Sequence, residues 1–233
     1  MPDWPSLFFL AYLLVLIPWL ALRSTRYLRD ATAGKVVLPS RQAIWINTLI
    51  SQLLMLALAW LIAGSISYPL FQLPSFGSRE ISAGIAALAV YFALRAIAGA
   101  MRSADERKRL FVYAIAPRTP SEWWLWSLTV LAASVAEEAA YRGVAMAILW
   151  YWLGNGWIAA AICSIAFAVA HSTQGWKSTV IIFGMAVVMH VLVWYSQTLI
   201  VAMVVHALYD FVAGYLIGRE ARTLETGVAV QQS

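Results

Sequence analysis

Seven long apolar stretches dominate this sequence, and each approaches the roughly 20 residues that a helix needs to cross a lipid bilayer. They lie at about residues 7–22, 44–64, 81–99, 123–150, 157–172, 179–195 and 198–218. Hydrophobic residues make up 62% of the chain and charged residues only 12%, about half the charged share of a soluble domain. Too little polar surface remains to face water, so we predict an all-α, polytopic transmembrane helical bundle of about seven spans.

Two segments complicate this count of spans. Arg95 interrupts the third stretch, which crosses the membrane only if the arginine side chain reaches the lipid headgroups. Residues 65–78 are uncharged and contain Pro69 and Pro74. An eighth, re-entrant element in residues 65–80 is therefore an alternative to seven simple spans.

Basic residues gather around alternate ends of the apolar stretches. They are Arg23, Arg26, Arg29, Lys35, Arg41, Arg95, Arg102, Arg107, Lys108, Arg109, Arg118, Lys177, Arg219 and Arg222. With seven spans all of them lie on one side of the membrane, which the positive-inside rule makes cytoplasmic. We expect a multi-pass protein of the cell membrane with its N-terminus outside and its C-terminus in the cytoplasm.

Composition also narrows the classes of partner and cofactor. Cys163 is the only cysteine, so an intramolecular disulfide and a cysteine-based metal site are excluded. The net charge of +5 comes from the loops, where it reports orientation and not a nucleic-acid partner. We expect one integral membrane domain over residues 1–233 that contacts the lipid bilayer and binds no nucleic acid. The oligomeric state stays open.

Three charged residues lie inside the fourth stretch, in the segment SVAEEAAYRGVA. A charged side chain at the bilayer centre costs at least about 2.5–3.5 kcal/mol, so such residues are functional candidates. Glu138 and Arg142 are four residues apart and can pair on one helix face. Glu137 points about 100° away from Glu138 and has no partner in its own helix. We therefore interpret Glu137 as a candidate general base. A structural Glu–Arg pair that locks two helices is the alternative.

All three histidines of the chain lie in predicted spans. His171 ends the segment FAVAH, and His206 begins the segment HALYD. Asp210 follows His206 by one helical turn, so it can accept a proton from the imidazole or fix its tautomer. His190 has no acidic neighbour in sequence, and we interpret it as a packing residue or a water contact.

These segments resemble the motifs of a known family. EEAAYR resembles the EExxxR motif of the CPBP family, the CAAX-protease and bacteriocin-processing group of glutamic intramembrane endopeptidases. FAVAH resembles its FxxxH motif, and HALYD resembles its last motif, usually HxxxN. The motifs occur in the family's order on separate spans. The resemblance covers about residues 118–217, which would form the catalytic core.

The resemblance implies a hydrolase that cleaves a peptide bond of a membrane-associated or lipid-modified protein or peptide. Glu137 would activate water and His171 would help to orient it. His206 and the residue at 210 would form the oxyanion site. The remaining motif residues, Glu138 and Arg142, would support Glu137 and the substrate. Asp210 departs from the usual asparagine, and an ionised aspartate donates no hydrogen bond. Prenylated CAAX proteins, leader peptides and C-terminal sorting tails all remain open as substrates.

We expect no cofactor and no metal, because the histidines and glutamates lack a short-range zinc spacing and Arg142 would repel a cation. Neither an HExxH segment nor a rhomboid-like GxS pattern is present. Three other functions would also account for these residues. They are a metal-dependent protease, a non-proteolytic membrane scaffold or regulator, and a proton-coupled transporter.

The orientation can be tested with reporter fusions. A reporter fused after Ser233 should be cytoplasmic, and one inserted in the turn at residues 196–198 should be external, because the basic loops stay inside. Reporter activity on both sides of the membrane measures this. The opposite pattern would overturn the orientation.

Overall fold

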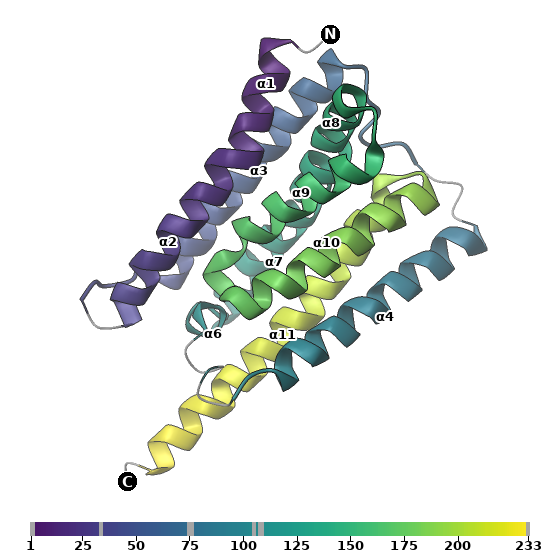
Figure 1. Cartoon of the computed structure of the whole chain (residues 1–233). Helices are drawn as coiled ribbons and strands as arrows, with labels where there is room; N and C mark the ends of the chain where they lie inside the picture. The colour runs from purple at the N-terminus through teal and green to yellow at the C-terminus, as the bar shows by residue number, and fades with distance from the viewer. Residues whose placement is uncertain (1–2, 33–34, 74–76, 104–105, 107–109, 232–233) are drawn as a thin grey trace.

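The computed structural model describes residues 3–32, 35–73, 77–103, 106 and 110–231, with the side chains of residues 29, 32 and 224–231 excepted. All regular structure in these residues is helical (Figure 1). The first half contains α1 (Trp4–Ala11), η1 (Tyr12–Leu16), α2 (Ile17–Thr32), α3 (Arg41–Ser65), α4 (Ser78–Ala100) and α6 (Phe111–Ala114). The second half contains α7 (Pro120–Glu137), η2 (Glu138–Ala145), α8 (Met146–Leu153), α9 (Gly156–Ala170), η3 (Ser172–Gln174), α10 (Trp176–Ser196) and α11 (Leu199–Gln231).

Each of the seven predicted stretches falls largely within a helix or a continuous helical run, which confirms the all-helical class. Five runs in the described part of the chain are long and apolar enough to cross a membrane. They are Trp4–Leu28, Arg41–Ser65, Ser78–Ala100, Trp176–Ser196 and Leu199–Thr223. The chain is therefore a multi-pass membrane protein. The count of seven spans stays a prediction, because α9 is shorter and the run from α7 to α8 contains the charged motif.

The segment that could hold a re-entrant element, the alternative to seven simple spans, is not helical over residues 66–73. Residues 66–73 form turns after α3, and residues 74–76 lie outside the described residues. Leu70 is buried, and a Cβ atom added at Gly143 would lie 3.0 Å from the Leu70 side chain. Thr198 donates to the Gln72 carbonyl at 2.8 Å. This loop therefore closes one end of the bundle.

The helices surround the short π-helical segment η2. It contacts α3, α9, α10 and α11, and all eight of its residues are buried. Alanines in and next to this segment are almost fully covered, namely Ala136, Ala139, Ala140 and Ala145. Small side chains let neighbouring helices approach closely inside a membrane. The charged motif consequently lies at the centre of the bundle.

A second π-helical turn, η1, precedes Pro18 in the first helical run. Proline has no backbone N–H, so a carbonyl one turn earlier loses its helical donor. Inside a membrane such a carbonyl needs another partner. The Tyr141 hydroxyl, from η2, donates to the Leu13 carbonyl at 3.4 Å. The proline thereby links the first helical run to the central segment.

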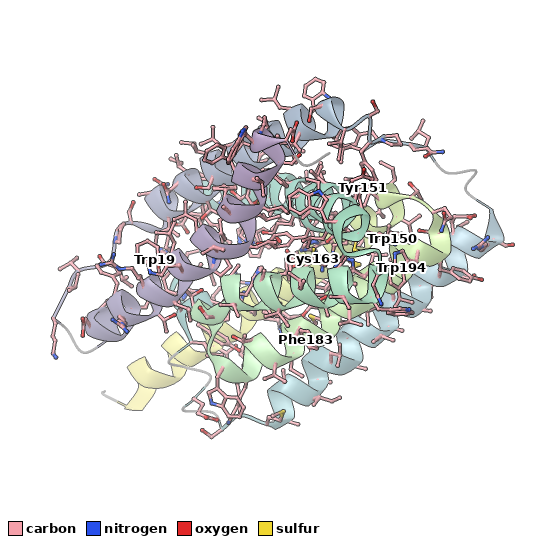
Figure 2. The ribbon with its side chains drawn as sticks, turned by 45° about the horizontal axis from the view of Figure 1, so that its top comes forward. Trp19, Trp150, Tyr151, Cys163, Phe183 and Trp194 are labelled. Carbon is pink, nitrogen blue, oxygen red and sulfur yellow. The ribbon has the colours of Figure 1, made fainter. Side chains whose placement is uncertain are left out.

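The two ends of the bundle differ in chemistry. Trp150, Tyr151 and Trp194 lie near one end, whereas Trp19 lies toward the other (Figure 2). The ends of α2 and α4 and the C-terminal end of α11 lie toward the end opposite the N-terminus (Figure 1). There Lys177 donates to the Glu106 carboxylate at 2.9 Å, and this hydrogen bond, with one from the Ser103 backbone, lowers the pKa of that exposed carboxyl. An ion pair thus joins the start of α10 to the segment after α4 at this end of the bundle.

Close packing of α7 on α11 yields a test of the fold. A Cβ atom at Gly214 would lie 2.1 Å from the Trp126 ring, so Gly214→Ala forces the two helices apart. Overpacking typically costs about 1–3 kcal/mol. We expect a lower melting temperature in detergent. Gly99→Ala is the matched control, since a Cβ there meets nothing within 4 Å, and it should melt like the wild type. Equal melting of both variants would contradict the packing.

Candidate active site

Glu138 and Arg142 form the predicted ion pair at the start of η2. The Arg142 guanidinium lies 3.3 Å from Glu138 Oε1, and the two side chains are 1% and 0% exposed. Glu138 Oε1 also lies 2.8 Å from Nδ1 of His206, on α11. A buried charge is stable only when its partners satisfy it. Glu138 is therefore held by groups from two helices.

Arg142 connects the first two sequence motifs through an aromatic ring. Its guanidinium stacks on Phe167 with 4.3 Å to the ring centroid. The Phe167 ring in turn packs against the His171 ring, with centroids 4.6 Å apart. On the far side Arg142 reaches the Ala186 carbonyl of α10 at 3.5 Å. Cation–π stacking accounts for an aromatic residue at the first position of FAVAH.

His206 lies between three carboxylates. Nδ1 faces Glu138, as above, and Nε2 lies 3.5 Å from Asp210 Oδ2 and 3.9 Å from Glu137 Oε2. Asp210 is near His206, as its spacing predicts, but the short hydrogen bond of the ring is the one that Nδ1 donates to Glu138. Carboxylates only accept hydrogen bonds when ionised. Both ring nitrogens can donate here only while the imidazole carries both protons.

Glu137 has a different environment from its neighbour in sequence. It has no partner in its own helix, as predicted, but Gln52 of α3 donates to its Oε1 at 2.7 Å. Its carboxylate lines a cavity of about 740 Å³. Our sequence interpretation missed Gln52, although an amide inside an apolar stretch was a usable signal. Gln52 also lies outside residues 118–217, so a group beyond the predicted core contacts the candidate base.

His171 lines the same cavity as Glu137 and Asp210. It follows the last residue of α9 and is half-buried. Its Nδ1 lies 2.8 Å from the Phe167 carbonyl. A carbonyl oxygen only accepts, so Nδ1 carries the proton of this hydrogen bond and Nε2 is free to accept one. In the described part of the chain no hydrogen bond joins His171 to Glu137, and the cavity lies between the helices that hold them.

His190 is more than a remote packing residue. It is 2% exposed on α10, and it lies within electrostatic reach of Glu138 and Arg142. Its Nε2 has no hydrogen-bond partner among the described residues. The acidic neighbour that its own segment lacks comes from another helix. Packing alone therefore does not describe its surroundings.

Metal ligation is not apparent in the described residues, where no group of three or more His, Cys, Asp or Glu side chains has a metal-binding arrangement. The Arg142 guanidinium already occupies the space beside Glu138 Oε1 where a cation would bind. Cys163 is buried as a free thiol.

One comparison with known proteins gives a match. Residues 119–212 match the sequence model of the family described as type II CAAX prenyl endopeptidase, Rce1-like. The matched segment contains all six candidate residues, from Glu137 to Asp210. No curated protein and no solved structure matches the chain.

The hydrogen bond from Gln52 to Glu137 can be tested by substitution. Gln52→Leu removes the donor to Glu137, and a hydrogen bond to a charged group is worth about 1.5–3 kcal/mol. We expect kcat for peptide cleavage to fall about 10–100-fold with little change in KM, because the base is displaced and the substrate surface is kept. Steady-state kinetics in detergent measures both.

The control for this substitution is Asn47→Leu, which removes an amide from an exposed position of the same helix. It should leave kcat unchanged. Unaltered kcat in Gln52→Leu, with a wild-type melting temperature, would show that Gln52 does not position Glu137.

Proposed function

We propose that this chain, which contains an Rce1-like type II CAAX prenyl endopeptidase family domain at residues 119–212, is an intramembrane endopeptidase that uses a glutamate-activated water. The observation that best supports this is the placement of Glu137. Its carboxylate lies at the wall of a cavity inside the bundle, 3.9 Å from the His206 ring. A base and a hydrogen-bond donor thus meet at one accessible point.

In the proposed reaction Glu137 accepts a proton from a water molecule in the cavity while the water oxygen attacks the peptide carbonyl carbon. Gln52 holds the carboxylate through Oε1 and leaves Oε2 on the side of His206. The unprotonated Nε2 of His171 accepts a hydrogen bond from the other O–H of the same water and so orients the water. After the C–N bond breaks, the proton on Glu137 passes to the departing amine.

In this proposal His206 supplies the positive charge that stabilises the oxyanion of the tetrahedral intermediate. Its Nε2–H donates to the oxyanion, while Glu138 holds Nδ1 at 2.8 Å and fixes the plane of the ring. A preorganised donor of this kind is typically worth about 2.7–4 kcal/mol in the transition state. Arg142 lies 3.3 Å from Glu138 Oε1 and holds that carboxylate in place, so it is a positioning residue. Asp210 stabilises the protonated ring from the other side.

The substrate in this proposal is a membrane-associated protein or peptide that enters from the bilayer. The cavity has apolar walls from α2 and α3, including Ile17, Leu20 and Met55, besides its polar lining residues. This combination suits a lipid-modified or membrane-embedded segment. The family's CAAX prenyl substrates are the first class to test.

The test is hydrolysis of a quenched fluorescent peptide that ends in a farnesylated cysteine and three further residues, by purified protein in nanodiscs. Wild-type protein should cleave it, and Glu137→Gln should lower the rate by about 10²–10⁴-fold, the usual contribution of a general base. The introduced amide keeps the shape of the side chain and can still accept from Gln52, so the variant should melt like the wild type.

Full activity in Glu137→Gln would contradict the assignment of the base. The same assay with chelators distinguishes this mechanism from a metal-dependent protease. Activity should survive EDTA and phenanthroline, whereas loss of activity with recovery on added zinc would establish a metalloprotease. Cleavage of neither this peptide nor an unprenylated transmembrane peptide would favour the scaffold.

A further inference from the structure

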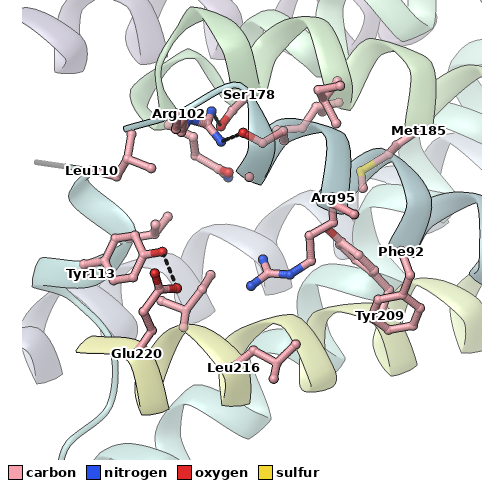
Figure 3. A pocket seen from close by; sticks show the side chains of 18 residues that line it. Phe92, Arg95, Arg102, Leu110, Tyr113, Ser178, Met185, Tyr209, Leu216 and Glu220 are labelled. Atoms are coloured by element: carbon pink, nitrogen blue, oxygen red, sulfur yellow. Dashed lines mark hydrogen bonds between the residues drawn. The ribbon is translucent and has the colours of Figure 1, made fainter. Parts of the chain in front are cut away.

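A second cavity lies beside the candidate active site. It has a volume of about 430 Å³ and lies among α4, α6, α10 and α11 (Figure 3). The two cavities share five lining residues, Arg95, Val112, Gln174, Tyr209 and Ile217. The two cavities are therefore adjacent, and Arg95 lies in the wall of both. The smaller cavity is near the lower end of the roughly 300–1,000 Å³ typical of ligand pockets, which suits a short tail.

Arg95 points into this cavity (Figure 3). Arg95 forms a side-chain hydrogen bond with Tyr209, and no salt bridge joins it to another residue in the described part of the chain. Arginine within an apolar helix is costly unless a partner compensates its charge. The structure thus contains a half-buried guanidinium whose counter-ion the described residues do not supply.

The other charged groups of the cavity are already engaged. Arg102 donates to Ser178 Oγ at 2.7 Å and to the Ala98 carbonyl at 3.3 Å. The Glu220 carboxylate accepts from the Tyr113 hydroxyl at 2.8 Å. Arg95 is therefore the cation best placed to receive a ligand, and a planar guanidinium matches a carboxylate with two parallel hydrogen bonds.

We propose that Arg95, which lies outside the matched residues 119–212, binds the C-terminal carboxylate of the peptide substrate. The inference rests on the proposed function, because it takes the ligand to be a peptide that reaches Glu137. A lipid phosphate is the other source of an anion. It is disfavoured because Arg95 lines the cavity that contains Glu137 and Asp210, where a resident headgroup would lie in the path of the substrate.

Equilibrium binding tests this without requiring cleavage. Two farnesylated peptides that differ only in a free C-terminal carboxylate or a C-terminal amide are titrated into Glu137→Gln protein in phosphatidylcholine nanodiscs. The carboxylate peptide should bind about tenfold tighter or better, the usual scale of a hydrogen bond to a charged group. Adding Arg95→Gln should make the two affinities equal, and Arg95→Lys should keep part of the difference, since lysine retains the charge without the fork.

Unchanged affinity for the amide peptide in Arg95→Gln shows that the variant is folded. Arg26→Gln, which removes the same charge from an exposed position on α2, should keep the wild-type ratio. The inference is overturned if the carboxylate peptide still binds more tightly than the amide peptide in Arg95→Gln. It is also overturned if the two peptides bind equally well before this substitution. A ratio that phosphatidylglycerol in the nanodiscs abolishes overturns it too, because the anion is then a headgroup phosphate. Because the ratio needs no hydrolysis, absence of Glu137-dependent cleavage would overturn the endopeptidase and leave the Arg95 result intact.

Discussion

The buried Glu138–Arg142 pair is the interaction on which the rest of the structure depends. Two charges this deep in an apolar bundle are destabilising unless their geometry and remaining hydrogen bonds compensate the loss of water. Three helices provide that compensation, through the Phe167 ring on α9, the Ala186 carbonyl on α10 and the His206 ring on α11. Removing one member would leave the other charge unpaired. The requirement that folds the centre of the bundle therefore also positions the imidazole.

Glu137 and Glu138 show how two adjacent carboxylates acquire different roles from their surroundings. Glu138 is fully buried and faces a guanidinium, which suits a permanently ionised structural group. Glu137 faces a neutral amide, Gln52, and a cavity, which suits the acid–base role proposed for it. Environments that separate two titratable groups in this way are how acid–base roles are divided at active sites. The helix widens to a π turn directly after Glu137, a feature often found at functional sites.

The contacts that depend on spacing along one helix could be predicted from the sequence, whereas those between helices needed the structure. Apolar runs located the helices, and a spacing of four residues located the Glu138–Arg142 pair. Periodicity carries no information about which helix lies opposite, so it could not reveal that Gln52 meets Glu137 or that Glu138 makes the short bond to His206. Nor could periodicity show that the Arg95 side chain lines a cavity between helices.

In this arrangement Asp210 acts on the His206 ring mainly through its charge. Because Glu138 already holds Nδ1 of His206, Asp210 is not needed to fix the ring, and its oxygen lies 3.5 Å from Nε2, at the limit of a hydrogen bond. Asparagine at this position would add a donor to the oxyanion site. Aspartate instead adds a third carboxylate around the imidazole, on the side where Glu137 Oε2 lies 3.9 Å from Nε2. Only the doubly protonated ring can donate from both nitrogens. In the proposed mechanism the oxyanion donor is accordingly His206 alone, and the carboxylate at 210 compensates for the missing amide through its charge.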